Sequence, residues 1–249
     1  MKKAGLSVAV LDMVDQLLGR ILDAHTAANL RTAIEAKGIT VDTGVQIRAI
    51  EENRVLLADG RSYPADLVIL STGYRANTAL AKAAGLDADR TVEVDAHLLT
   101  SHPDILSCGD CTSSSAATWL QSVEQGRIAG ANALGCDLCY SAIPEPAMIH
   151  TADTSLMVIG DMGKQAGLSY TFRHYRLEGA YDLFAVNPVT EGRTGADLTL
   201  CLQEDRLCGA ALLGDLSTMA IIEPAVLEGH TLEAICAELC KKGAKFHEK

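Results

Sequence analysis

Two short apolar runs that each end in a turn of small residues restrict the fold of this chain more than any other feature. Residues 67–70 (Leu-Val-Ile-Leu) lead into Ser-Thr-Gly, and residues 105–108 (Ile-Leu-Ser-Cys) lead into Gly-Asp. Uninterrupted apolar runs of this length are typical of strands buried on both faces, as in α/β proteins. Open sheets of that class bind ligands at the carboxyl ends of their strands, and small residues there let the backbone approach a ligand closely. Either turn alone is structural as often as it is functional.

A third strand is predicted at residues 7–11, and it ends at Asp12. Dinucleotide-binding folds use an acid in this position to accept hydrogen bonds from the adenosine ribose. In those folds a Gly-rich phosphate loop lies about 20 residues before the acid. Eleven residues precede Asp12, and Gly5 is the one glycine among them. An acid after a strand is in most proteins a solvated strand end, so Asp12 alone does not identify a nucleotide site.

The order of these elements resembles that of flavoprotein reductases with two dinucleotide-binding domains. The matching segments are Asp12, Ser-Thr-Gly-Tyr-Arg-Ala-Asn at 71–77, Ile-Leu-Ser-Cys-Gly-Asp-Cys at 105–111, and Val-Glu-Gln-Gly-Arg-Ile-Ala-Gly-Ala-Asn at 123–132. Within this pyridine nucleotide-disulfide oxidoreductase superfamily, the chain is most similar to the branch of NADH–rubredoxin reductases and nitrite reductase large subunits. Residues 1–135 carry most of the resemblance, and residues 206–214 are similar to the carboxyl-terminal module of that branch.

The resemblance implies an FAD-dependent NADH oxidoreductase that passes electrons to a small redox protein or a metal centre. Asp12 would bind the NADH ribose, and an acid there disfavours the 2′-phosphate of NADPH. Thr72 and Gly73 would lie at the junction of the NAD and FAD domains. Hydride would pass directly from the nicotinamide to the flavin, so no catalytic acid or base is expected from the protein.

The same resemblance assigns flavin contacts to the second turn and to the helix that follows it. Gly109 and Asp110 would hydrogen-bond the ribityl chain of FAD. The helix that begins at Trp119 and Leu120 would direct the positive end of its dipole toward the flavin.

We therefore predict an α/β protein with incomplete, three-layer Rossmann-like domains for FAD and NAD(P), followed by an α+β domain. The expected domains are a partial NAD(P)-binding domain at 1–75, a partial FAD-binding domain at 76–140 and an α+β domain at 145–249. Pro144 and Pro146 mark the linker before the last of these. Helices are predicted at 22–37, 78–84, 119–134, 218–227 and 232–239. Further strands are predicted at 39–43, 45–50, 54–58, 91–94, 155–159, 168–177, 180–186, 197–203 and 207–213.

The Gly-rich halves of both cofactor domains are not found in this sequence. We therefore expect FAD and NAD sites that are incomplete, and weak or no turnover by the chain alone. Unpaired strand edges favour association with another chain, so a homodimer or a complementary amino-terminal chain is expected. The alternative is a non-enzymatic remnant that acts as an interaction or assembly module through its α+β domain.

Charge, hydropathy and cysteine content limit the possible partners, the location and the redox role of the protein. The chain has 21 Lys and Arg against 32 Asp and Glu, and a net charge of −11 disfavours nucleic acid as a partner. No apolar stretch approaches the roughly 20 residues that span a bilayer, and we expect a cytoplasmic protein. The eight cysteines are expected to be reduced. One Cys-x-x-C pair, Cys136 and Cys139, leaves a redox or metal role open, but the second pair of a zinc ribbon is not found.

Overall fold

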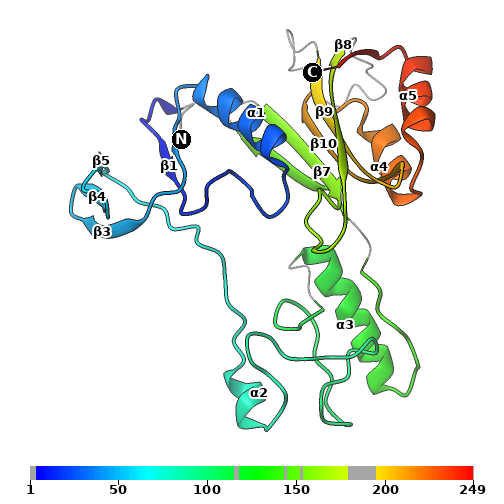
Figure 1. Cartoon of the computed structure of the whole chain (residues 1–249). Coiled ribbons are helices and arrows are strands. Elements are labelled where there is room, and N and C mark those ends of the chain that lie inside the picture. Colours follow the sequence, from blue (N-terminus) through cyan, green and yellow to red (C-terminus); the bar gives the residue numbers. More distant parts are fainter. Residues whose placement is uncertain (1–3, 115–117, 143–144, 152–153, 179–194, 249) are drawn as a thin grey trace. The chain divides into compact units, whose positions relative to one another are not determined.

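The computed structural model describes residues 4–114, 118–142, 145–151, 154–178 and 195–248 (Figure 1). Two compact units make up the chain, one from residues 1–68 and 144–249 and the other from residues 69–143. Helices and strands are mixed along the sequence, which confirms the predicted α/β class. The three predicted domain boundaries stay predictions.

A six-stranded antiparallel sheet is the centre of the first unit. Its strands, in spatial order, are β11 (Lys245–Glu248), β8 (Thr171–Glu178), β9 (Ala196–Gln203), β10 (Arg206–Gly214), β7 (Thr154–Gly160) and β6 (Ala147–Thr151). The strands predicted at 155–159, 168–177, 197–203 and 207–213 are confirmed, the second of them beginning later than predicted. The sequence reasoning missed β6 and β11, and the strand predicted at 180–186 lies outside the described residues.

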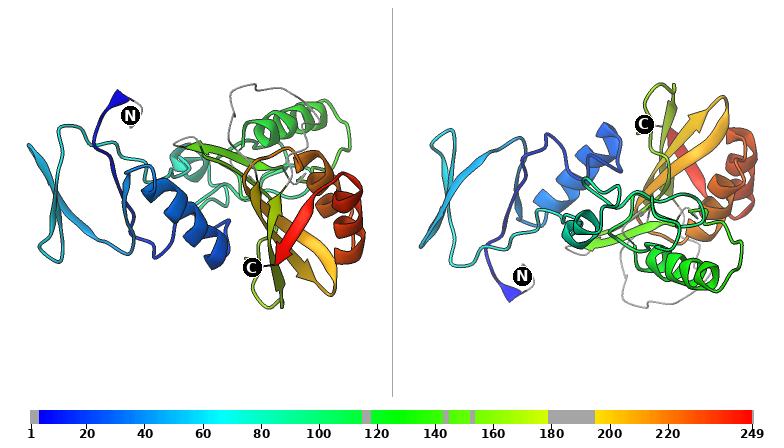
Figure 2. Two further views of the ribbon diagram at one scale, coloured as in Figure 1. Left: turned by 90° about the horizontal axis from the view of Figure 1, so that it is seen from above. Right: turned by 90° about the horizontal axis from the view of Figure 1, so that it is seen from below.

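Helices pack on both faces of this sheet. On one face, α4 (Met219–Leu227) and α5 (Leu232–Lys241) pack against a cluster that includes Ala210 and Leu212 of β10. Figure 2 shows these two helices, coloured orange to red, together on one side of the sheet. On the other face, α1 (Ala24–Glu35) packs against a second cluster that includes Ala211 and Leu213. The alternation along β10 follows from the period of two of a strand, and it explains why its run of apolar residues is buried throughout.

The amino-terminal segment adds a short parallel pair, β1 (Ala9–Leu11) and β2 (Thr40–Asp42). Between them, α1 begins at Asp23, whose carboxylate accepts hydrogen bonds from the backbone N–H groups of His25 and Thr26 at 3.0 and 3.2 Å. This cap satisfies two amides that have no partner within the helix. The strand at residues 7–11 is thus confirmed, but it is largely exposed rather than buried, because β2 is its one hydrogen-bonded neighbour in the described sheet.

A three-stranded meander follows, formed by β3 (Ile47–Glu51), β4 (Arg54–Leu57) and β5 (Ser62–Pro64). It is tied to β2 through Asp42, whose Oδ2 accepts hydrogen bonds from Tyr63 at 2.7 Å and from Arg61 at 2.5 Å. The hydrogen bond from Tyr63 is the main cause that lowers the pKa of the Asp42 carboxyl. The strands predicted at 45–50 and 54–58 and the turn at Gly60 are confirmed, whereas the sequence reasoning missed β5.

The second unit contains α2 (Ala79–Ala83) and α3 (Trp119–Ala133), which confirms two predicted helices. The strands predicted at 67–70, 91–94 and 105–108 are wrong. Residues 67–70 pair with no described strand, and Leu67, Ile69 and Leu70 are exposed. The other two segments make only isolated bridges, Val92 with Thr112 and Leu99 with Leu106. A strand is defined by its backbone partners, and in the described residues these runs have too few.

Candidate functional site

Gln125, a buried residue of α3, holds the loop at Gly109 through hydrogen bonds. The backbone N–H of Gly109 donates to Oε1 of Gln125 at 2.7 Å, and the hydroxyl of Thr112 donates to the same oxygen at 3.3 Å. The amide nitrogen of Gln125 in turn donates to the carbonyl of Ser114 at 3.2 Å. Gln125 is fully buried, and Gly109 has φ +80°, a conformation that favours glycine. Three hydrogen bonds from one side chain therefore fix the shape of this loop.

Asp110 extends from this fixed loop into solvent. Its Oδ1 accepts a hydrogen bond from the hydroxyl of Ser122 at 2.9 Å. Ser122 belongs to the first turn of α3, so the orientation of the Asp110 carboxylate is coupled to the start of that helix. An exposed carboxylate has about four acceptor positions and takes further hydrogen bonds readily. Asp110 is therefore suited to bind a hydroxyl-bearing ligand.

The amino terminus of α3 lies in the same group of residues. The hydroxyl of Thr118 caps the helix by accepting from the N–H of Gln121 at 3.4 Å. The next two side chains are open to solvent: Trp119 is 82% exposed and Leu120 is 63% exposed. A helix of fifteen residues carries a partial positive charge at this end. The structure thus brings together Gly109, Asp110 and the start of α3, and their contacts with FAD stay predictions.

Asp12 lies at the carboxyl end of β1, in the first unit. Its backbone N–H donates to the carbonyl of Asp42 at 3.0 Å, and its carbonyl accepts from Val45 at 3.0 Å. Its carboxylate Oδ1 accepts from the N–H of Val14 at 3.2 Å. These bonds hold the side chain, which is partly buried, at the strand end. The ribose-binding role of Asp12 stays a prediction.

Thr72 and Gly73 lie in an exposed stretch of the second unit that forms no helix or strand. Gly73 has φ +84°, so this turn does need glycine. Their predicted place at a domain junction stays a prediction.

Sequence reasoning missed Gln125 and Ser122. One signal was available for Gln125: in the predicted helix, Gln121, Gln125 and Ile128 recur at helical spacing on one face. Two glutamines on a face that also carries isoleucine indicate buried side chains with polar partners.

Cys136 and Cys139 lie after the carboxyl end of α3. Both thiols are exposed, and Cys139 Sγ lies 3.6 Å from Nε2 of His97. Among the residues that the structure describes, no group of three or more His, Cys, Asp or Glu side chains is placed to hold a metal ion. In that part of the chain, no helix is both long and apolar enough to cross a membrane.

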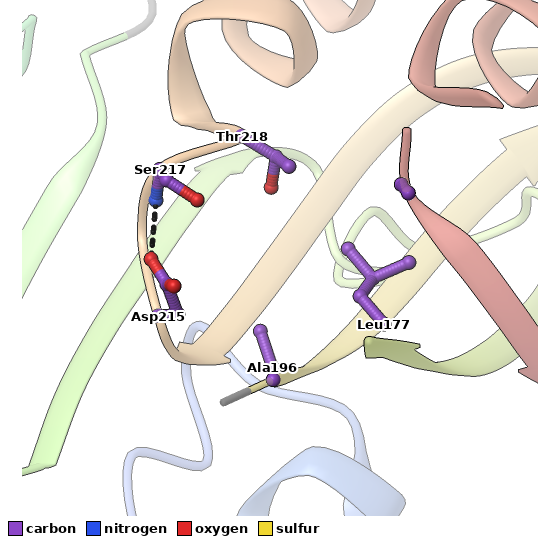
Figure 3. A pocket seen from close by; sticks show the side chains of 7 residues that line it. Leu177, Ala196, Asp215, Ser217 and Thr218 are labelled. Atoms are coloured by element: carbon purple, nitrogen blue, oxygen red, sulfur yellow. Dashed lines mark hydrogen bonds between the residues drawn. The ribbon is translucent and has the colours of Figure 1, made fainter. Parts of the chain in front are cut away.

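A small cavity lies beside the start of α4 (Figure 3). Its lining includes Ala196, Asp215 and Thr218, and the N–H of Ser217 donates to Asp215 Oδ1 at 2.8 Å. The buried hydroxyl of Thr218 has no hydrogen-bond partner among the described residues. Because the cavity has room for about one water molecule, it is too small for a cofactor.

A family model described as pyridine nucleotide-disulphide oxidoreductase matches residues 1–126, which is more than half of the 249 residues. The chain belongs to the pyridine nucleotide-disulphide oxidoreductase family. This confirms the resemblance inferred from the strand-end motifs. Asp12, Asp110 and Gln125 all lie inside the matched segment of this family member.

Relatives of this family member are longer than the chain. It is 36% identical over 152 residues to a nitric oxide reductase FlRd-NAD(+) reductase of Aeromonas salmonicida, covering 58% of the chain and 38% of the relative. It is 31% identical over 172 residues to the ferredoxin–NAD(+) reductase component of a biphenyl dioxygenase system from Paraburkholderia xenovorans, covering 64% and 42%. The chain thus spans about two fifths of the curated relatives it matches.

The fold is also similar to solved structures. A NAD-dependent persulfide reductase from A. fulgidus superimposes with a TM-score of 0.79 at 24% identity, over 94% of this chain and 46% of that one. A likeness at this identity supports the fold alone. It covers nearly the whole chain, so it includes the carboxyl-terminal sheet that lies beyond the segment matched by the family model.

Proposed function

We propose that this chain forms part of an FAD-dependent NADH oxidoreductase that transfers electrons from NADH through the flavin to a small redox protein. The observation that carries the proposal is the Gly109–Asp110 loop, which Gln125 and Ser122 fix beside the amino terminus of α3. Family membership supports it, because the loop and Gln125 both lie within the matched segment. FAD, when bound, supplies the hydride acceptor and the means of passing electrons onward.

The residues present fit one part of FAD. The exposed carboxylate of Asp110 would accept hydrogen bonds from ribityl hydroxyls, and Ser122 would hold it in orientation. The first turn of α3 would stabilise negative charge on the reduced flavin ring. Gln125 would keep the Gly109 backbone in place without touching the cofactor. Two fixed elements of suitable charge thus support binding of the sugar and ring portions.

Asp12 would bind the adenosine ribose of NADH. A carboxylate at this strand end accepts hydrogen bonds from ribose hydroxyls and repels a 2′-phosphate, which favours NADH over NADPH. The two relatives described above carry NAD(+) in their names, in agreement with this preference. Thr72 and Gly73 would form the turn between the NAD and FAD portions.

The direct test is flavin retention. The purified chain would be incubated with excess FAD and dialysed, alone and together with the amino-terminal part of a family relative, and flavin absorbance would then be recorded. We expect retained flavin in the mixture, and loss of its visible absorbance on addition of NADH. A colourless protein under both conditions would contradict the proposal.

A matched pair of variants locates the site. Asp110→Ala removes a charged hydrogen-bond acceptor, so the Kd for FAD is expected to rise by roughly tenfold to a hundredfold. Asp104→Ala removes an equally exposed carboxylate of the same unit and is expected to leave the Kd unchanged. Equal effects of the two substitutions would show that net charge, rather than Asp110 itself, governs binding.

The name of one relative supports a small redox protein as the electron acceptor. Ferredoxin appears in the name of one relative, so a small redox protein is the partner class that we propose. A homodimer, a complementary amino-terminal chain and a cytoplasmic location stay predictions from the sequence. The alternative of a non-enzymatic assembly module would gain support if the chain bound no flavin in either arm of the test.

A further inference from the structure

A β-bulge in β10 places two cysteines on the same face of the carboxyl-terminal sheet. Leu207 pairs with Leu202 and Gly209 pairs with Cys201, so Cys208 is an extra residue on the β10 side. A bulge of this kind redirects a side chain that regular alternation would send to the opposite face. Leu207 belongs to the cluster under α4 and α5, whereas Cys208 packs with the cluster under α1, where Cys201 is also found.

Two glycines allow the backbone to pack closely around the bulge. Gly209 pairs directly with Cys201. A Cβ on Gly209 would lie 2.2 Å from the carbonyl oxygen of Asp161, and a Cβ on Gly160 would lie 2.2 Å from that of Cys208. The backbone can therefore approach closely here only because both positions are glycine.

The two thiols are in contact. Sγ of Cys208 lies 3.7 Å from Sγ of Cys201 and 3.4 Å from the Cys201 carbonyl oxygen. Cys201 is fully buried, and Cys208 is partly exposed. Cys208 is thus the more exposed of the two residues, and the Cys201 thiol lies within reach of a group formed on it.

We infer that Cys201 and Cys208 form a reversible dithiol–disulfide couple that low-molecular-weight disulfides oxidise. The Cys208 thiolate attacks one sulfur of the small disulfide, giving a mixed disulfide and releasing one small thiol. Cys201 then loses its proton and attacks Sγ of Cys208, forming the Cys201–Cys208 bond and releasing the second small thiol. The protein loses two electrons and two protons, and the small disulfide gains them.

The surroundings of the two thiols explain why their oxidation is slow near neutral pH. Burial raises the pKa of Cys201, and the adjacent Cys208 and the carboxylates of Asp161 and Asp23 raise it further. Burial also raises the pKa of Cys208. The first step, attack of Cys208 on the small disulfide, is therefore slow near neutral pH, because only the thiolate form attacks. The second step is intramolecular and benefits from the thiol contact.

Peptide mapping tests the couple on the whole chain. Native protein would be incubated with oxidised glutathione, acid-quenched, alkylated under denaturing conditions and digested with trypsin. Arg206 lies between the two cysteines, so cleavage after it leaves them on separate peptides unless a disulfide joins them. We expect a linked pair that fragmentation assigns to Cys201 and Cys208 and that dithiothreitol separates. Alkylation of Cys201 in all oxidised protein would overturn the inference.

Three substitutions distinguish the mechanism from nonspecific oxidation. Cys208→Ser is expected to abolish the link and leave Cys201 fully alkylated. Cys236→Ser removes another partly buried cysteine from the same tryptic peptide and is expected to leave the link intact. Cys201→Ala is expected to trap Cys208 as its mixed disulfide with glutathione. If Cys208 stayed unmodified in that variant, the proposed order of attack would be wrong.

Discussion

Replacement of Gln125 by alanine tests how the proposed cofactor loop is held. The side chain is fully buried and makes hydrogen bonds to Gly109, Thr112 and Ser114. Each such bond contributes about 1 kcal/mol net, so losing all three costs about 3 kcal/mol of local stability. Every 1.4 kcal/mol is a factor of ten, which makes the loop open roughly a hundredfold more often.

Hydrogen exchange measured by mass spectrometry on peptides that cover the Gly109 amide reports this opening directly. In Gln125→Ala, exchange of that amide should accelerate roughly a hundredfold. Gln125→Met has a similar length but makes none of the three bonds, so it should behave like the alanine variant. Glu124→Ala, which alters a partly exposed neighbour that pairs with Arg127 on the same helix, should leave exchange at Gly109 unchanged.

The methionine variant provides the decisive comparison. If Gln125→Met retained slow exchange while Gln125→Ala did not, packing volume rather than hydrogen bonding would hold the loop. If both variants exchanged at the original rate, Gln125 would not support the loop at all.

Four further substitutions test other parts of the fold. Gly209→Ala forces a Cβ against a carbonyl oxygen and should lower the free energy of unfolding by about 3 kcal/mol or prevent folding. Gly130→Ala places a Cβ in open space within a helix and should raise the free energy of unfolding by about 0.5–1 kcal/mol. Denaturant midpoints measure both changes. The lowered pKa of Asp42 contributes stability that is present above its ordinary value of 3.8 and lost as the pH falls through the folded value; Tyr63→Phe should return that pKa toward 3.8 in an NMR titration. Thr26→Val removes a buried hydrogen bond of 2.8 Å between α1 and β9 and should cost about 1 kcal/mol in chemical denaturation.

The helices and three carboxyl-terminal strands, β7, β9 and β10, were predictable because their signals are local. Apolar residues at helical spacing and the stop signal at Gly38 placed a helix at 22–37, and α1 spans Ala24–Glu35 within that range. These three strands were recognisable as apolar runs with turns between them. For β7, β9 and β10, the predicted and observed ranges agree within one residue.

The wrong strands show where local signals are insufficient. Residues 67–70 are as apolar as β7, yet they form no strand, since no described strand lies beside them to complete the hydrogen bonds. Conversely, β11 carries Lys, His and Glu and was missed, because pairing with β8 rather than its own composition creates it. Strand formation depends on partners that are remote in the sequence, and a composition pattern does not contain them.

In the candidate site, too, local motifs could be found in the sequence, whereas tertiary contacts could not. Gly109 and Asp110 were named from the sequence because the turn of small and acidic residues at 109–110 is part of the resemblance to the family, and their contact with a cofactor stays a prediction. Gln125 and Ser122, which fix those residues, lie elsewhere in the sequence and became evident only through their contacts. The bulge that joins Cys201 to Cys208 is likewise a property of strand register, and eight cysteines in a sequence do not indicate which two meet. In this chain, therefore, sequence motifs identify the groups that would bind, whereas tertiary pairing determines which of them are held rigidly enough to do so.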